Sequence, residues 1–80
     1  MTIDQLKEVH QASPFRPFVL RMADGTKISV RHREFLSHSR TGRTVIVHQE
    51  NDHYSVLDVL MITEIEVLSR SEKRSRGNGR

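Results

Sequence analysis

The sequence has no cysteine and no tryptophan, and its aromatic side chains are limited to three phenylalanines and one tyrosine. Without cysteine the chain forms no disulfide bond, thiolate metal site or thiol nucleophile, and this absence fits a reducing compartment. The longest uninterrupted apolar run is Val59-Leu60-Met61-Ile62, whereas a membrane-spanning helix needs about 20 such residues. The chain also begins without a basic segment that leads into an apolar one, the mark of a secretory signal. We therefore expect a cytoplasmic protein that does not enter a membrane.

The 80 residues provide room for one domain. A folded chain this short buries only about 60% of the surface that its unfolded form exposes, so its free energy of unfolding is small. Because disulfide bonds are excluded, assembly with another chain is the remaining way to add stability. We therefore expect a protein partner or a homo-oligomer.

The formal net charge is +3 and the pI is about 10, but the basic residues are unevenly placed. Residues 69–80 hold five basic residues against one acidic residue, whereas residues 1–68 hold eight against nine. No apolar side chain follows Leu68, and such a polar segment cannot bury enough surface to offset its loss of conformational entropy. The sequence thus predicts one globular domain over residues 1–68 and a disordered basic tail over residues 69–80.

Charges are also segregated inside the predicted domain. Residues 16–43 carry a net charge of +5, and residues 44–68 carry five acidic residues with no Lys or Arg. Two interpretations follow from this pattern. Either a basic face and an acidic face steer a partner or a second copy, or neighbouring strands pair Arg with Glu across a sheet.

A short N-terminal helix is predicted first. Thr2-Ile3-Asp4-Gln5 fits a capping box, in which the Thr2 hydroxyl and the Gln5 side chain each accept a hydrogen bond from a backbone N–H at the helix start. The helix has one apolar stripe with a period of 3.6 residues, made of Ile3, Leu6, Val9 and His10. Ser13-Pro14 ends the helix, because proline disfavours helical geometry in the residue before it.

From Phe18 the apolar period changes to two, as in strands. One alternating run covers residues 18–23 and a second covers residues 27–31. Asp24-Gly25 between them predicts a hairpin, since glycine accepts the positive φ of a tight turn. Residues 33–36 lack alternation and are expected to form one helical turn that places Phe35 and Leu36 in the core, followed by a polar loop over residues 37–42.

A second hairpin is predicted from a β-branched strand over residues 44–48, a turn over residues 49–52 and a returning strand over residues 54–57. Residues 58–61 interrupt the alternation, and a fifth strand follows over residues 62–67. Its side chains are expected to alternate between core and solvent, with Ile65 and Val67 inside and Glu64 and Glu66 outside.

One helix followed by five short strands predicts an α+β, mainly β, fold. We expect a five-stranded antiparallel sheet that curls into a small SH3-like barrel, because closure hides the sheet edges and the helix caps an open end. The alternative is an open meander with the helix on one face.

The polar residues give little support for chemistry. Five histidines are present, at His10, His32, His38, His48 and His53. None has the short spacing of a helical or finger-type metal site, although His32 with His38, or His48 with His53, can converge across a hairpin with Asp52 or Glu50 as a third ligand. No strained glycine elbow frames a hydroxyl, and the glycines are not clustered for phosphate binding. We therefore expect no enzyme activity, no cofactor and no small-molecule substrate.

Nucleic-acid binding is an alternative function. Its predicted contacts are a basic loop region and the tail, comprising Arg31, Arg33, Arg40, Arg43, Lys73, Arg74 and Arg76. Phe35 and Tyr54 are the aromatic candidates for stacking on bases, although Phe35 is also expected in the core.

Several stretches of the chain resemble a group of small uncharacterised bacterial proteins of about this length. They are Pro14-Phe15-Arg16-Pro17-Phe18, Leu20-Arg21-Met22-Ala23-Asp24-Gly25, Arg33-Glu34-Phe35, Gly42-Arg43-Thr44-Val45-Ile46-Val47 and Ile62-Thr63-Glu64-Ile65-Glu66. The resemblance implies a bacterial, stand-alone domain and no particular activity. In the order of its elements the chain is also similar to Sm-like proteins, which place an Asp-Gly hairpin after the first strand. It lacks their basic-Gly pair between the last two strands, so their RNA binding is not carried over.

Two functional hypotheses result. The leading one is a non-catalytic interaction module that self-associates or binds a protein partner, because the domain is small, its charges are separated and its strands have edges to cover. The other is an RNA- or DNA-binding module.

Overall fold

The computed structural model describes residues 1–68. Its first element, α1 (Ile3–His10), begins at the predicted capping box. The Gln5 backbone N–H donates to Thr2 Oγ1 over 3.3 Å, and the Thr2 backbone N–H donates to Gln5 Oε1 over 3.1 Å. Leu6 and His10 are buried, so the predicted stripe is the face that α1 packs against the rest of the domain.

The first predicted hairpin is confirmed. Strands β1 (Phe18–Met22) and β2 (Lys27–Val30) pair antiparallel, with Phe18 opposite Val30 and Leu20 opposite Ile28. Gly25 adopts a φ of 93° in the turn, a conformation that glycine takes without steric cost. The other side of β1 pairs with β6 (Ile62–Val67), which gives a three-stranded sheet in the order β2-β1-β6.

The segment after β2 differs in part from the prediction. The expected helical turn is confirmed as the 3-10 helix η1 (Arg33–Phe35). Of the two side chains expected in the core, Leu36 is buried but Phe35 is only half-buried. The expected loop over residues 37–42, however, begins as a further strand, β3 (Leu36–His38). Leu36 is buried, and once it is anchored the next residues pair with the neighbouring β4. Only three residues are involved, too few to show a period in the sequence.

The second predicted hairpin is also confirmed. It consists of β4 (Thr44–His48), the 3-10 helix η2 (Glu50–Asp52) at its tip, and β5 (Tyr54–Asp58). The predicted interruption after it is the 3-10 helix η3 (Val59–Met61). Strands β3, β4 and β5 form a second three-stranded sheet in that order.

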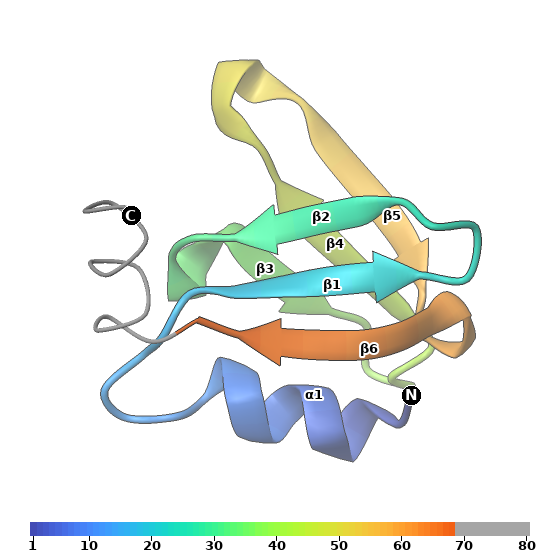
Figure 1. Ribbon diagram of the computed structural model, residues 1–80, viewed down its shortest axis with the longest axis horizontal. Helices are drawn as coiled ribbons and strands as arrows, with labels where there is room; N and C mark the ends of the chain where they lie inside the picture. The colour runs from blue at the N-terminus through green and yellow to red at the C-terminus, as the bar shows by residue number, and fades with distance from the viewer. Residues whose placement is uncertain (69–80) are drawn as a thin grey trace, which may run out of the picture.

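The predicted α+β, mainly β, class is therefore confirmed, but the single five-stranded sheet and the closed barrel are wrong. Residues 1–68 form two antiparallel three-stranded sheets, one in front of the other (Figure 1). The physical reason lies at η1, which breaks the strand pattern between β2 and β3 and directs the chain into the second sheet. The alternative of one open meander is wrong for the same reason.

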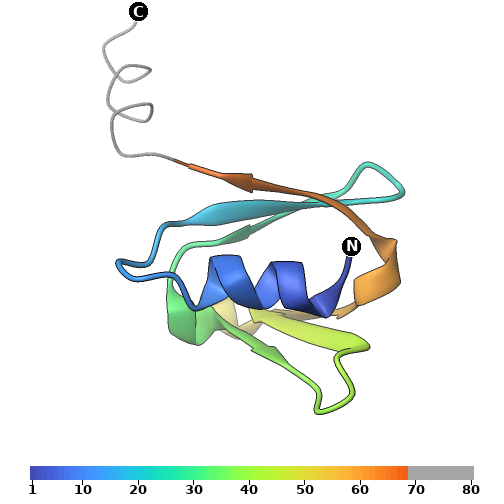
Figure 2. The ribbon, with the colours of Figure 1, turned by 90° about the horizontal axis from the view of Figure 1, so that it is seen from below.

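The core lies between the two sheets, and α1 covers one open side of it (Figure 2). Its buried side chains are Leu6, Phe18, Leu20, Ile28, Val30, Leu36, Val45, Val47, Leu57, Val59 and Ile62. In β6 the prediction is only partly right, because Ile65 is half-buried but Val67 is 40% exposed. Val67 lies at a surface depression beside Val9 and Ala12, beyond the end of the core. No helix within residues 1–68 is long and apolar enough to cross a membrane.

Candidate functional site

The Arg33 side chain makes contacts within the domain. Its Nε donates to the His10 carbonyl over 3.3 Å, and its Nη2 donates to the Ala12 carbonyl over 2.6 Å. The guanidinium also lies 5.6 Å from the centre of the Phe15 ring. In return, His10 Nε2 donates to the Arg33 carbonyl over 2.8 Å. Arg33 therefore joins the C-terminal end of α1 to η1, and its Nε and Nη2 donors are used within the fold although the residue is exposed.

Arg40 and Arg43 lie in the β3–β4 loop, at the other end of α1. Gly42, between them, has a φ of 76° and is so close to Ile3 that an added Cβ would be 2.9 Å from its side chain. An eight-residue helix is about 12 Å long, and this length separates the β3–β4 loop from Arg33. The structure thus does not bring the four predicted arginines into one patch. The three tail residues of the prediction, Lys73, Arg74 and Arg76, lie outside the described residues.

Arg31 borders a hollow in the surface. Directly after β2, its Nη1 atom lies 3.2 Å from Oε2 of Glu50 in η2. The pair spans a hollow of about 590 Å³ between β2 and the tip of the β4–β5 hairpin. In Figure 1 the tip of this hairpin extends past β2. We call this hollow the β2–hairpin groove. Its walls carry Lys27, Ser29 and Arg31 on one side and His48, Tyr54 and Ser55 on the other.

The backbone of β2 is unpaired along this groove. The Met22 N–H donates to the Thr26 carbonyl over 2.8 Å, and hydrogen-bonded pairs alternate along an antiparallel ladder. The pairs Leu20–Ile28 and Phe18–Val30 are then the hydrogen-bonded ones. The N–H and C=O groups of Lys27 and Ser29 consequently point away from β1, and within residues 1–68 β2 has no second neighbouring strand.

A second free edge belongs to β5. The Gln49 N–H donates to the His53 carbonyl and the Val59 N–H donates to the Arg43 carbonyl. By the same alternation, the backbone groups of Tyr54, Val56 and Asp58 point away from β4.

Large apolar side chains surround this β5 edge. Tyr54 is 63% exposed and Val56 61% exposed, and in η3 Leu60 and Met61 are exposed as well. Natural sheet edges usually carry Lys, Pro or a bulge that prevents further pairing. The sequence of β5, Tyr54-Ser55-Val56-Leu57-Asp58, holds no Lys or Pro, so this edge is open to another strand.

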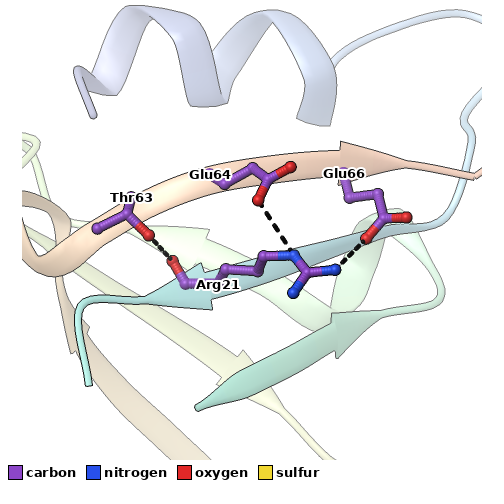
Figure 3. A network of polar contacts seen from close by, with 4 residues as sticks. All are labelled: Arg21, Thr63, Glu64 and Glu66. Carbon is purple, nitrogen blue, oxygen red and sulfur yellow. Dashed lines mark hydrogen bonds and ion pairs between the residues drawn. The ribbon is translucent and has the colours of Figure 1, made fainter. Parts of the chain in front are cut away.

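The opposite charges of the two halves of the chain are partly paired on the outer face of the first sheet. Arg21 in β1 lies opposite Glu64 in β6, and its Nη2 donates to Glu66 Oε1 over 2.9 Å (Figure 3). Its Nε lies 3.1 Å from Glu64 Oε1 as an ion pair without good hydrogen-bond alignment. The predicted pairing of Arg with Glu across a sheet is therefore confirmed here, and this network stabilises the sheet.

The histidines do not form one group, because His10 is on α1 whereas His48 and His53 line the β2–hairpin groove. His10 is buried between Arg33 and the Gln11 side chain, and the His48 ring lies 6.3 Å from the Tyr54 ring. Within residues 1–68 no three His, Asp or Glu side chains are grouped to hold a metal ion.

Comparison with protein families, with curated proteins and with solved structures finds no match for this chain. The candidate functional features are the two free edges and the groove described above. Sequence reasoning missed Lys27 and Val56 as site residues. For Val56 a signal existed, because the lack of Lys and Pro in β5 is readable from the sequence, whereas the groove at Lys27 depends on where the distant hairpin tip lies.

Proposed function

We propose that this protein is a non-catalytic interaction module that self-associates by pairing β5 with β5 of a second copy. The observation that supports the proposal is the β5 edge, where unpaired backbone groups and exposed apolar side chains coincide. Such an edge can add a strand from another chain through main-chain hydrogen bonds. Two copies related by a two-fold axis use the same surface, so one edge is sufficient for a closed dimer.

The side chains of β5 suit an antiparallel arrangement centred on Val56. Val56 then lies opposite Val56 of the second copy, and Tyr54 lies opposite Asp58 of the second copy. The Tyr54 hydroxyl is a donor and the Asp58 carboxylate is an acceptor, so this pair is complementary. Ile46 lies beside Val56 on β4, and the apolar row continues across both subunits in one six-stranded sheet.

Val56→Lys tests this proposal. A lysine at the centre of the edge places two like charges opposite each other, which disfavours pairing. We expect light scattering at several protein concentrations to show a concentration-dependent dimer for the unchanged chain and a monomer for Val56→Lys. Ser37→Lys is the matched control, because Ser37 is also exposed but lies on β3, the opposite edge of the same sheet.

Circular dichroism of each variant verifies that the fold is intact. A chain that remains monomeric at millimolar concentration, or a Val56→Lys variant that dimerises as strongly as the unchanged chain, contradicts the proposal.

Nucleic-acid binding remains the alternative, and one observation favours it. The exposed Tyr54 ring lies at the same groove as Lys27 and Arg31, so an aromatic stacking surface and two cations are neighbours. Against it stand the internal contacts of Arg33 and the distance of Arg40 and Arg43 from the groove.

A further inference from the structure

The β2–hairpin groove adjoins the β5 edge, because Tyr54 and Ser55 of β5 line it, but the unpaired strand that it offers is β2. The outward N–H and C=O groups of Lys27 and Ser29 offer main-chain donors and acceptors to a segment that lies along β2. Lys27, Ser29 and Arg31 alternate with the buried Ile28 and Val30, so their side chains share the outer face of the sheet. An added strand would place its own side chains beside these three.

The basic side chains of the groove determine which extended segments it can bind. Lys27 in β2 and Arg31 directly after β2 are four residues apart, a separation of about 13 Å along an extended chain. His48 and His53 are on the hairpin wall. Among the described residues that line the groove, Glu50 is the one carboxylate. The groove is therefore electrostatically complementary to a segment with acidic side chains.

Glu50 occupies the position that a ligand carboxylate would take beside Arg31. It lies in the hairpin tip, where Asn51 and Asp52 have φ values of 73° and 65°, and its contact with Arg31 is the one ion pair seen across the groove within residues 1–68. The side chains of Arg31 and Glu50 are 67% and 69% exposed. An exposed ion pair contributes about 0–1 kcal/mol to stability. Replacing Glu50 by a ligand carboxylate beside Arg31 therefore costs little free energy.

We propose that the β2–hairpin groove binds an extended acidic segment of another protein as an added strand on β2, and that Glu50 competes with this segment for Arg31. The segment carries carboxylates four residues apart, opposite Lys27 and Arg31, with a small side chain between them opposite Ser29. A peptide with the order Glu-Val-Ser-Val-Glu, blocked at both ends and flanked by Gly-Ser, meets this description. The groove would thus be a second interaction site, for a partner other than a copy of this chain.

Fluorescence anisotropy with this labelled peptide tests the proposal on the full chain. We expect Lys27→Gln and Arg31→Gln to weaken binding, and the same peptide with Lys in place of Glu not to bind. Glu50→Gln is expected to lower the Kd about two- to five-fold, because it frees Arg31 from an exposed ion pair. Glu8→Gln is the matched control, since it changes the net charge equally on the solvent face of α1, away from the groove.

The outcomes separate the possibilities. No binding of the Glu peptide at low salt, or equal binding of the Lys peptide, overturns the proposal. An equal gain in Glu50→Gln and Glu8→Gln overturns the competition by Glu50, because it shows a general charge effect. Binding of a labelled oligothymidylate that requires Lys27 and Arg31, together with no binding of the peptide, assigns the groove to nucleic acid. Repeating the titration with Val56→Lys keeps this result independent of self-association.

Discussion

Arg33 shows how one side chain can close a small domain that lacks disulfide bonds. Its guanidinium reaches the carbonyl of His10, the last residue of α1, and that of Ala12 beyond it, and its own carbonyl accepts the His10 Nε2–H. A cation at a helix C-terminus also interacts favourably with the helix dipole. The helix is attached in this way to η1, at the point where the chain passes from one sheet to the other.

We expect Arg33→Met to lower the free energy of unfolding by about 0.5–1.5 kcal/mol, because the methionine retains part of the apolar contact with Phe15 but donates no hydrogen bond. Urea unfolding followed by circular dichroism measures the change. Arg40→Met is the control, since within residues 1–68 the Arg40 side chain makes no hydrogen bond or ion pair. Equal stability of the two variants would show that the Arg33 contacts contribute nothing.

At the scale of elements, the β1–β2 turn depends on an ionised side chain. The pKa of Asp24 lies below its ordinary value of 3.8, because the Thr26 backbone N–H and then the Thr26 side chain donate hydrogen bonds to the carboxylate. A carboxylate with a lowered pKa in the folded state stabilises the fold at pH values above its ordinary pKa. That stabilisation disappears as the pH falls through the lowered pKa.

We therefore expect Asp24→Ala to lower the urea midpoint at pH 7 and the difference from the unchanged chain to vanish toward pH 2. Asp24→Asn provides the control. Its amide oxygen accepts the Thr26 N–H without a charge and does not titrate, so we expect a urea midpoint at pH 7 between those of Asp24→Ala and the unchanged chain, with no acid dependence from this position. A constant difference between Asp24→Ala and the unchanged chain from pH 7 to pH 2 would contradict the role of the charge.

The elements that could be predicted are those whose signals are local. The capping box at Thr2, the turn at Asp24-Gly25 and the interruption before Ile62 depend on neighbouring residues, and all three are confirmed. Strand β3 could not be predicted, because Leu36–His38 pairs with β4 only after the chain has turned at η1. The exposure of Val67 was also missed, since alternation gives a side chain's face but not how far the core extends.

For the whole molecule, the basic pI does not describe the domain. Residues 1–68 carry one more acidic than basic residue, and the excess of positive charge belongs to residues 69–80. Within the domain, Arg21 pairs with β6 and Arg31 pairs with the hairpin tip. Both pairs join the basic half of the sequence to the acidic half, so the fold reduces the separation of charge.

We expect a chain that ends at Leu68 to remain folded and to lose any affinity of the full chain for single-stranded DNA and RNA. The reason is that, in the full chain, the positive charges of residues 69–80 would supply most of the phosphate contacts. The observed binding constant of the full chain should fall steeply with salt concentration. Gel-shift titrations of both chains across a salt series measure this. Equal binding by the two chains would instead place the nucleic-acid site on the domain and favour the alternative function.

The sequence by itself determined the helix, both hairpins, the α+β class and the charge balance of residues 1–68 and 69–80, since these depend on local pattern or on counting. Only the tertiary structure decided that the strands divide into two sheets, that Arg33 is occupied while Arg31 borders a groove, and that β2 and β5 keep free edges. The physical reason is that these features depend on which distant segments meet. Contacts such as Arg33 with His10 and Arg31 with Glu50 leave no periodic signal along the chain.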